Sequence, residues 1–278
     1  MVRCVAIRYG VLARPNDRLT STSSTYSQPP WSLTSTPPHD PETRDGKHIG
    51  HKGLCAWTRG MQALIAYWSG CPLDATRLAH EAQEYAPLGT ALVRLRCIEA
   101  RAWSHLGDAS QTVRAITAAH VAREQASGVD DLHDEIGGEF TFDEARQGRC
   151  NGSAYVELGA AEPAITETRR AIELLGKMPP DRRSGKVEAE AYADLSAAYL
   201  LENEFDGARE ALAPVLVLPP ELRIEGLTQR LERVRSMVVR SPFRRSREAR
   251  QLREQIEAFT DDAVSRMLPS GPSSLAPS

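Results

Sequence analysis

Arginine and large aromatic side chains recur at helical spacing in this chain. The arginines fall in pairs separated by three or seven residues, which places the members of a pair on one helical face. A guanidinium binds a carboxylate through two parallel hydrogen bonds, so an aromatic entrance with arginines behind it suits an anionic or carboxylate-terminated peptide. The sequence therefore predicts a ligand-binding surface. Its candidate residues are Trp57, Tyr67, Arg94, Arg101, Arg146 and Arg149.

The same arginines are also compatible with a plain solvated surface. Exposed arginine is common in proteins, and an acid such as Glu99 is close enough along the chain to pair with one inside a helix. A ligand groove would make the arginines indispensable for binding, whereas a solvated face would leave them replaceable. Both interpretations are open at this point.

A second group, His48, His51 and Cys55, has i, i+3, i+7 spacing and could present three metal ligands on one helical face. Zinc sites usually need a fourth ligand and supporting hydrogen bonds, and no neighbouring residue offers them. We therefore expect no metal site and no cofactor. The sequence also offers no recognisable catalytic triad, phosphate loop or carboxylate pair, so we do not expect an enzyme.

A repeated spacing indicates which elements position the candidate residues. Four turn residues are each followed, five and twelve positions later, by two further residues that are mostly small: Gly70 by Ala75 and Ala82, Gly107 by Thr112 and Ala119, Gly159 by Ala164 and Ala171, and Asn203 by Ala208 and Val215. A large aromatic precedes three of these turns by four residues: Trp103, Tyr155 and Tyr199. This predicts pairs of antiparallel helices with small residues where the helices cross.

The spacing is similar to the tetratricopeptide repeat. Helical periodicity predicts five hairpins: 52–69 with 72–86, 90–106 with 109–126, 143–158 with 161–176, 184–202 with 206–217, and 221–240 with 244–260. We therefore predict an all-α, tetratricopeptide-like α-solenoid of about five helix hairpins over residues 48–262, with its first helices lining a concave face. Residues 128–142 interrupt the register. Residues 1–47 and 263–278 are predicted to be disordered, because their Ser, Thr and Pro content cannot build a core.

Bulk composition excludes several classes of protein. The formal charge of −3 gives no overall attraction to nucleic acid or to anionic membranes. The five cysteines are widely spaced and form no CxxC pair, which favours reduced thiols in a cytoplasmic protein. No apolar run approaches the roughly 18 residues of a membrane span. Residues 1–15 also have the basic, acid-poor composition of an organelle transit peptide, which leaves that alternative open.

Three stretches resemble the repeat region of bacterial Xre-type helix-turn-helix transcriptional regulators. They are HKGLCAWTRGMQALIAYWSGCP (51–72), EIGGEFTFDEARQ (135–147) and LVLPPELRIEGLTQRLERV (216–234). The resemblance extends from residue 47 to residue 259 and implies a sensing domain in transcriptional control. Residues 1–47 contain no recognition helix preceded by a tight turn, so we expect no direct DNA binding by this chain alone.

The sequence thus predicts a non-enzymatic regulatory sensing or protein-interaction module that binds a peptide, small ligand or partner protein on its concave face. One alternative is a constitutive scaffold protein. Another is a helical-repeat phosphatase of a response regulator, for which Glu190 is the candidate for insertion into a partner's active site. Self-association through an apolar edge at Val238, Val239 and Phe243 is also possible.

Overall fold

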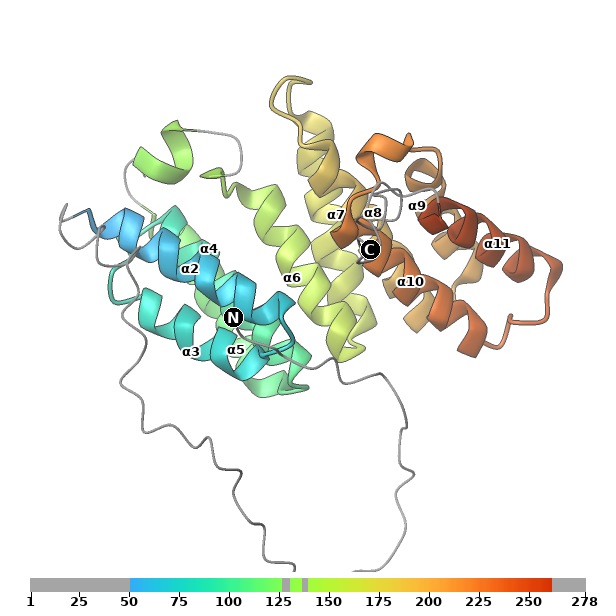
Figure 1. Ribbon diagram of the computed structural model, residues 1–278, viewed down its shortest axis with the longest axis horizontal. Helices are drawn as coiled ribbons and strands as arrows, with labels where there is room; N and C mark the ends of the chain where they lie inside the picture. Colours follow the sequence, from blue (N-terminus) through green and yellow to red (C-terminus); the bar gives the residue numbers. More distant parts are fainter. Residues whose placement is uncertain (1–50, 127–130, 137–139, 262–278) are drawn as a thin grey trace, which may run out of the picture.

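The computed structural model describes residues 51–126, 131–136 and 140–261. Every regular element within these ranges is helical, and the helices form successive antiparallel hairpins (Figure 1). The all-α solenoid of helix hairpins predicted from the repeat spacing is therefore confirmed. The predicted disordered segments, 1–47 and 263–278, lie outside the described residues.

The observed helices agree closely with the predicted ranges. The hairpins are α2 (Lys52–Trp68) with α3 (Pro72–Ala82), α4 (Thr90–His105) with α5 (Ala109–Glu124), α6 (Glu144–Leu158) with α7 (Ala161–Lys177), α8 (Gly185–Leu201) with α9 (Phe205–Leu216), and α10 (Glu225–Arg240) with α11 (Arg247–Asp261). One difference is at the start of α10, where Pro220–Leu222 forms a short 3-10 turn, η3, ahead of the helix. Pro219 and Pro220 have no backbone N–H to donate and restrict the residue before each of them, so the helix begins later.

The four turn residues of the repeat all have the left-handed backbone conformation. Their φ angles are 76° at Gly70, 74° at Gly107, 73° at Gly159 and 61° at Asn203, a region that glycine enters without strain and asparagine tolerates. In each case the following amide donates to the carbonyl five residues earlier, at 2.9 to 3.1 Å. This bond is the helix-ending Schellman motif. The sequence repeat is therefore a repeated helix C-cap.

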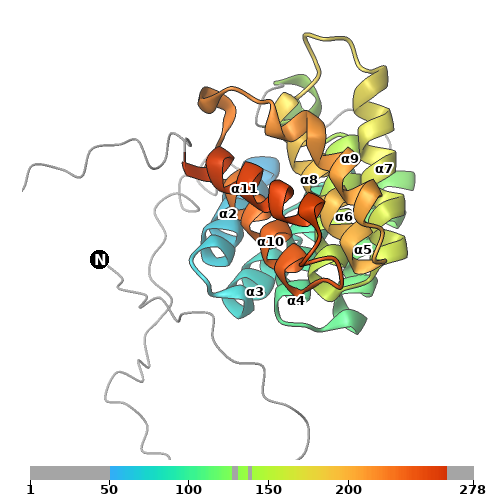
Figure 2. The same cartoon turned by 90° about the vertical axis from the view of Figure 1, so that its right-hand side faces the viewer.

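The helices form two layers. The first helices of the hairpins, α2, α4, α6, α8 and α10, contact one another in succession and make the inner layer (Figures 1 and 2). The second helices lie outside it, and α3 and α7 pack on the first helix of the next hairpin. In contrast, α5 touches α6 only sparsely. This weak contact coincides with the predicted break in the repeat.

The segment between α5 and α6 fills that break. It contains a π-helical turn, η1 (Asp131–Glu135), and then delivers Phe142 into a buried cluster with residues of α4, α5 and α6. Arg123 of α5 donates to the carbonyl oxygen of Phe142 at 2.7 Å, and Thr90 of α4 donates to the carboxylate of Asp134 at 3.1 Å. The insertion is thus fixed to the second hairpin.

The proposed self-association edge is largely internal. Val238 is fully buried in the core that joins the last two hairpins, and Phe243 stacks on Phe205 with ring centroids 5.4 Å apart. Only Val239 is exposed. The expectation of an apolar edge at these residues is corrected, because the hydrophobic stripe of α10 packs against α8 and α11.

Glycine permits the close crossing of α6 and α7. A Cβ atom added at Gly152 would lie 2.4 Å from Thr168 Cγ2 and 3.3 Å from the Thr168 backbone nitrogen. Gly148, one turn earlier, would meet the backbone oxygen of Glu167 at 3.0 Å and the Cβ of Ala171 at 3.3 Å. The small residues predicted at the crossing are therefore in contact there.

We predict opposite effects of alanine at two helical glycines. Gly152→Ala should lower the free energy of unfolding by about 1–3 kcal/mol, because the helices must separate to admit the methyl group. Gly176→Ala should raise it by about 0.5–1 kcal/mol, because this glycine of α7 has no neighbour within 4 Å and alanine reduces the entropy of the unfolded chain. Urea unfolding followed by circular dichroism measures both. Equal effects would contradict the packing argument.

Candidate functional site

The candidate residues lie on the inner helices, as the hairpin arrangement requires. Trp57 and Tyr67 belong to α2, while the four arginines are divided between α4 and α6. The expected exposure is wrong for two of them, since Arg94 and Arg101 are each only 7 % exposed. Aromatic rings of α2 and neighbouring inner helices cover them. The interpretation as a solvated face therefore fails for these two arginines.

Arg94 is held in an apolar setting. Its guanidinium carbon lies 5.8 Å from the ring centroid of Trp57, and its Nη2 donates to the sulfur of Met61 at 3.2 Å. Burial lowers the pKa of Arg94 to about 10, which still leaves it charged at neutral pH. No carboxylate within the described ranges pairs with it, and both its Nη1 and the Nε1 of Trp57 are buried without an acceptor.

The insertion covers this end of the inner face. Phe140 stacks on Trp57 with centroids 4.8 Å apart and an interplanar angle of 28°. Gly60 of α2 provides room for Arg94, because a Cβ at that position would lie 2.5 Å from Nη1. Arg94 is thus enclosed by aromatic, thioether and backbone surface.

Arg101 lies one heptad further along α4, against a second pair of aromatics. Its guanidinium carbon is 4.7 Å from the ring centroid of Tyr67 and 5.3 Å from that of Trp68. It forms no salt bridge with any residue that the structure describes, and its Nε is buried without an acceptor. Trp68 is 51 % exposed, so this end of the inner face is open to solvent.

Arg149 takes part in a buried network of alternating charge. It lies 3.3 Å from Glu190 of α8, which is 3.8 Å from Arg230 of α10. The Nε of Arg230 donates to Asp194 at 3.1 Å. Burial would raise the pKa of Glu190, but Arg230 and Arg149 reverse the shift and hold this pKa below its ordinary value. Glu190 is therefore held as a carboxylate between two guanidinium groups.

This position corrects the suggested phosphatase role of Glu190. Only 6 % of the residue is exposed, and both of its oxygens face arginines. A side chain that enters a partner's active site must be exposed and free to extend. Glu190 is neither.

Glu157 joins three inner helices. The Nη2 of Arg233 in α10 donates to one of its oxygens at 2.6 Å, and the Nδ1 of His105 in α4 is 3.4 Å from the other. Burial would raise the pKa of Glu157, but the His105 hydrogen bond and the charge of Arg233 lower it overall. α10 therefore reaches back to α6, which reflects the tight curvature of the stack.

We call the buried ionic groups of α4, α6, α8 and α10 the inner cluster. Its members are Arg101, Arg149, Glu157, Glu190, Asp194, Arg230 and Arg233. The sequence did not identify the residues of α10 as part of a site. A signal was present, because Arg230 occupies the apolar stripe formed by Leu227, Leu231 and Val234, where a charged residue must be buried.

Other candidate groups lie outside the inner cluster. Arg146 pairs with Asp143 at 2.8 Å, and Asp143 also caps α6. His51 caps α2 by accepting from the amide of Leu54, Cys55 is buried, and His48 is outside the described residues. The described part of the chain contains no group of three His, Cys, Asp or Glu side chains that could hold a metal ion. Its helices are also too short or too polar to cross a membrane.

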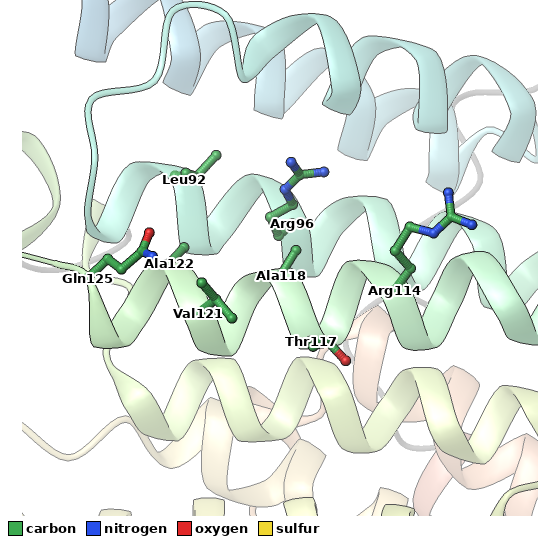
Figure 3. A pocket seen from close by; sticks show the side chains of 8 residues that line it. All are labelled: Leu92, Arg96, Arg114, Thr117, Ala118, Val121, Ala122 and Gln125. Atoms are coloured by element: carbon green, nitrogen blue, oxygen red, sulfur yellow. The ribbon is translucent and has the colours of Figure 1, made fainter.

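A separate hollow of about 520 Å³ runs along α4 and α5 (Figure 3). Its walls are mainly small or apolar, with Arg96 and Arg114 pointing outward beside it. Arg96 already pairs with Glu99 at 3.0 Å. The hollow shares no residue with the inner cluster and contains no buried charge without a partner, so the inner face is the stronger candidate site.

We predict that two buried arginines respond oppositely to replacement by methionine. Arg94→Met should leave the free energy of unfolding unchanged or raise it, because it removes a desolvated charge that no carboxylate balances. Arg230→Met should lower it by about 3–5 kcal/mol, because Asp194 and Glu190 lose their buried partner. Denaturant unfolding of both variants tests this contrast. An equal loss at Arg94 would show that its charge stabilises the fold.

We also predict a loss of stability in acid. The folded-state pKa values of Glu157 and Glu190 are below the unfolded value of about 4.3. Their stabilising effect is therefore present above that pH and is lost as the pH falls through the folded values. Melting temperatures between pH 7 and pH 3 should decline less steeply for Glu157→Gln than for the wild type. Glu162→Gln, an exposed change on α7, is the control and should follow the wild type.

No protein-family profile and no curated protein matches this chain. Two solved structures do: the kinesin light chain nearly identical TPR-like repeats of Podosopora anserina and a single-substitution form of the same protein. Each is 15 % identical to this chain with a TM-score of 0.50; the alignments cover 79 % and 76 % of this chain, and 99 % and 96 % of the respective solved chains. At this identity the likeness concerns the fold alone. The chain has a tetratricopeptide-like fold.

Proposed function

We propose that this chain is a non-enzymatic protein-interaction module whose concave face binds an acidic peptide segment of a partner protein. The observation that supports this function is the burial of Arg94 and Arg101 without a carboxylate in the described residues. Burying a charge without a counter-charge opposes folding. A bound carboxylate would supply the missing negative charge at both positions, because arginine pairs with it bidentately.

The spacing of the two arginines favours an extended peptide as the ligand. They are seven residues apart on α4, which corresponds to about 10 Å along the helix axis. An extended peptide covers that distance with about three residues. Trp57 at one arginine, and Tyr67 with Trp68 at the other, would provide apolar contact for the side chains between the acidic groups.

The regulatory setting is also part of the proposal. The resemblance of residues 47–259 to the repeat region of Xre-type regulators supports a role in cytoplasmic transcriptional control. A ligand that contacts several inner helices would change the curvature or the self-association of the solenoid, because each hairpin contacts mainly its neighbours. The partner would thereby be sensed as a change of shape.

We predict that two variants separate this function from nonspecific charge attraction. A peptide with two acidic residues three positions apart should quench or shift tryptophan fluorescence, and its Gln-substituted form should not. The double variant Arg94→Gln/Arg101→Gln should bind the acidic peptide about 100-fold more weakly, which corresponds to about 2.8 kcal/mol. Neither arginine forms a salt bridge in the described structure, so the variant should fold.

The matched control is Arg77→Gln/Arg209→Gln, which removes the same charge from the exposed faces of α3 and α9. It should bind as tightly as the wild type. Equal affinity of the Arg94/Arg101 variant would refute the proposal. If a partner protein co-purifies equally with both variants, the chain is a constitutive scaffold instead.

A further inference from the structure

Four arginines of the inner cluster have a buried N–H group without an acceptor in the described residues. The groups are Arg101 Nε, Arg149 Nε, Arg230 Nη2 and Arg233 Nη1. A buried donor that lacks an acceptor costs about 1–3 kcal/mol, and a charged donor costs more. Native structures contain only a few such groups, and each calls for an explanation such as a bound ion or water.

The four arginines lie around the same acids. Arg149 and Arg230 flank Glu190, and Arg233 pairs with Glu157. The charge of Arg101 acts on both carboxylates, although it is bonded to neither. The unmatched donors therefore belong to one electrostatic unit formed by α4, α6 and α10.

The acids of this unit do not have enough negative charge. Four guanidinium groups face three carboxylates, so the inner cluster has an excess of one positive charge. The oxygens of Glu190 and Glu157 already face Arg149, Arg230, Arg233 and His105. Water could accept from the remaining N–H groups but would not balance the charge, whereas an oxyanion would do both.

We propose that the inner cluster binds a small oxyanion of the carboxylate or phosphate class, between Arg101 of α4, Arg149 of α6 and Arg230 of α10. This goes beyond peptide recognition, because a free anion is sufficient. The bound anion joins the second hairpin to the third and the fifth, and so stabilises the curved form of the solenoid. A ligand that binds only the folded state raises the melting temperature as its concentration rises.

The test is thermal unfolding of the full chain in millimolar inorganic phosphate or succinate, with sodium chloride at equal ionic strength as the reference. At these concentrations general salt effects are matched between samples. We expect a saturable rise in melting temperature with at least one of the two anions. Isothermal titration calorimetry should show binding at least tenfold weaker in Arg101→Gln, a variant that loses no salt bridge within the described residues.

Arg209→Gln removes an equal charge from the exposed side of α9 and should bind the anion as the wild type does. A rise that is absent, does not saturate or is unchanged in Arg101→Gln would overturn the inference. Acidic peptides provide the separate arm of the test. Peptide binding without any small-anion binding would refute this site but leave the proposed function intact, and small-anion binding without peptide binding would do the reverse.

Discussion

The close crossing of the two helices in each hairpin is the constraint on which the rest of the molecule depends. Gly148 and Gly152 of α6 lie against Ala171 and Thr168 of α7, with no space for another methyl group. Short distances between the paired helices let the first helices of successive hairpins contact one another directly. The inner layer is thus packed tightly enough to bury long charged side chains that a looser stack would leave in water.

Burial of charge follows from that inner layer and differs along its length. Glu157, Glu190 and Asp194 hold arginines of α6 and α10 in place, whereas Arg94 and Arg101 have only aromatic and thioether neighbours. Buried ion pairs contribute little net stability compared with apolar packing, and unpaired ions oppose folding. The arginines of α4 are therefore better explained by recognition than by stability.

The sequence predicted the helices and turns well, because these depend on neighbouring residues. The left-handed caps at Gly70 and Asn203 could be anticipated from their types and spacing. The ion pair of Arg230 with Asp194 could not, because 36 residues separate them and their meeting depends on the accumulated rotation of the hairpins. Arg146 was misjudged for a local reason: Asp143, the cap of its own helix, pairs with it.

The insertion between the second and third hairpins gives the inner face two unlike ends. At one end Phe140 stacks on Trp57 and helps to enclose Arg94, whose lowered pKa indicates an environment with little water. At the other end Trp68 is exposed beside Arg101. An anionic chain would therefore enter at Arg101 and place its leading carboxylate at Arg94. Pairing there is strongest, because electrostatic attraction increases as the local dielectric constant falls.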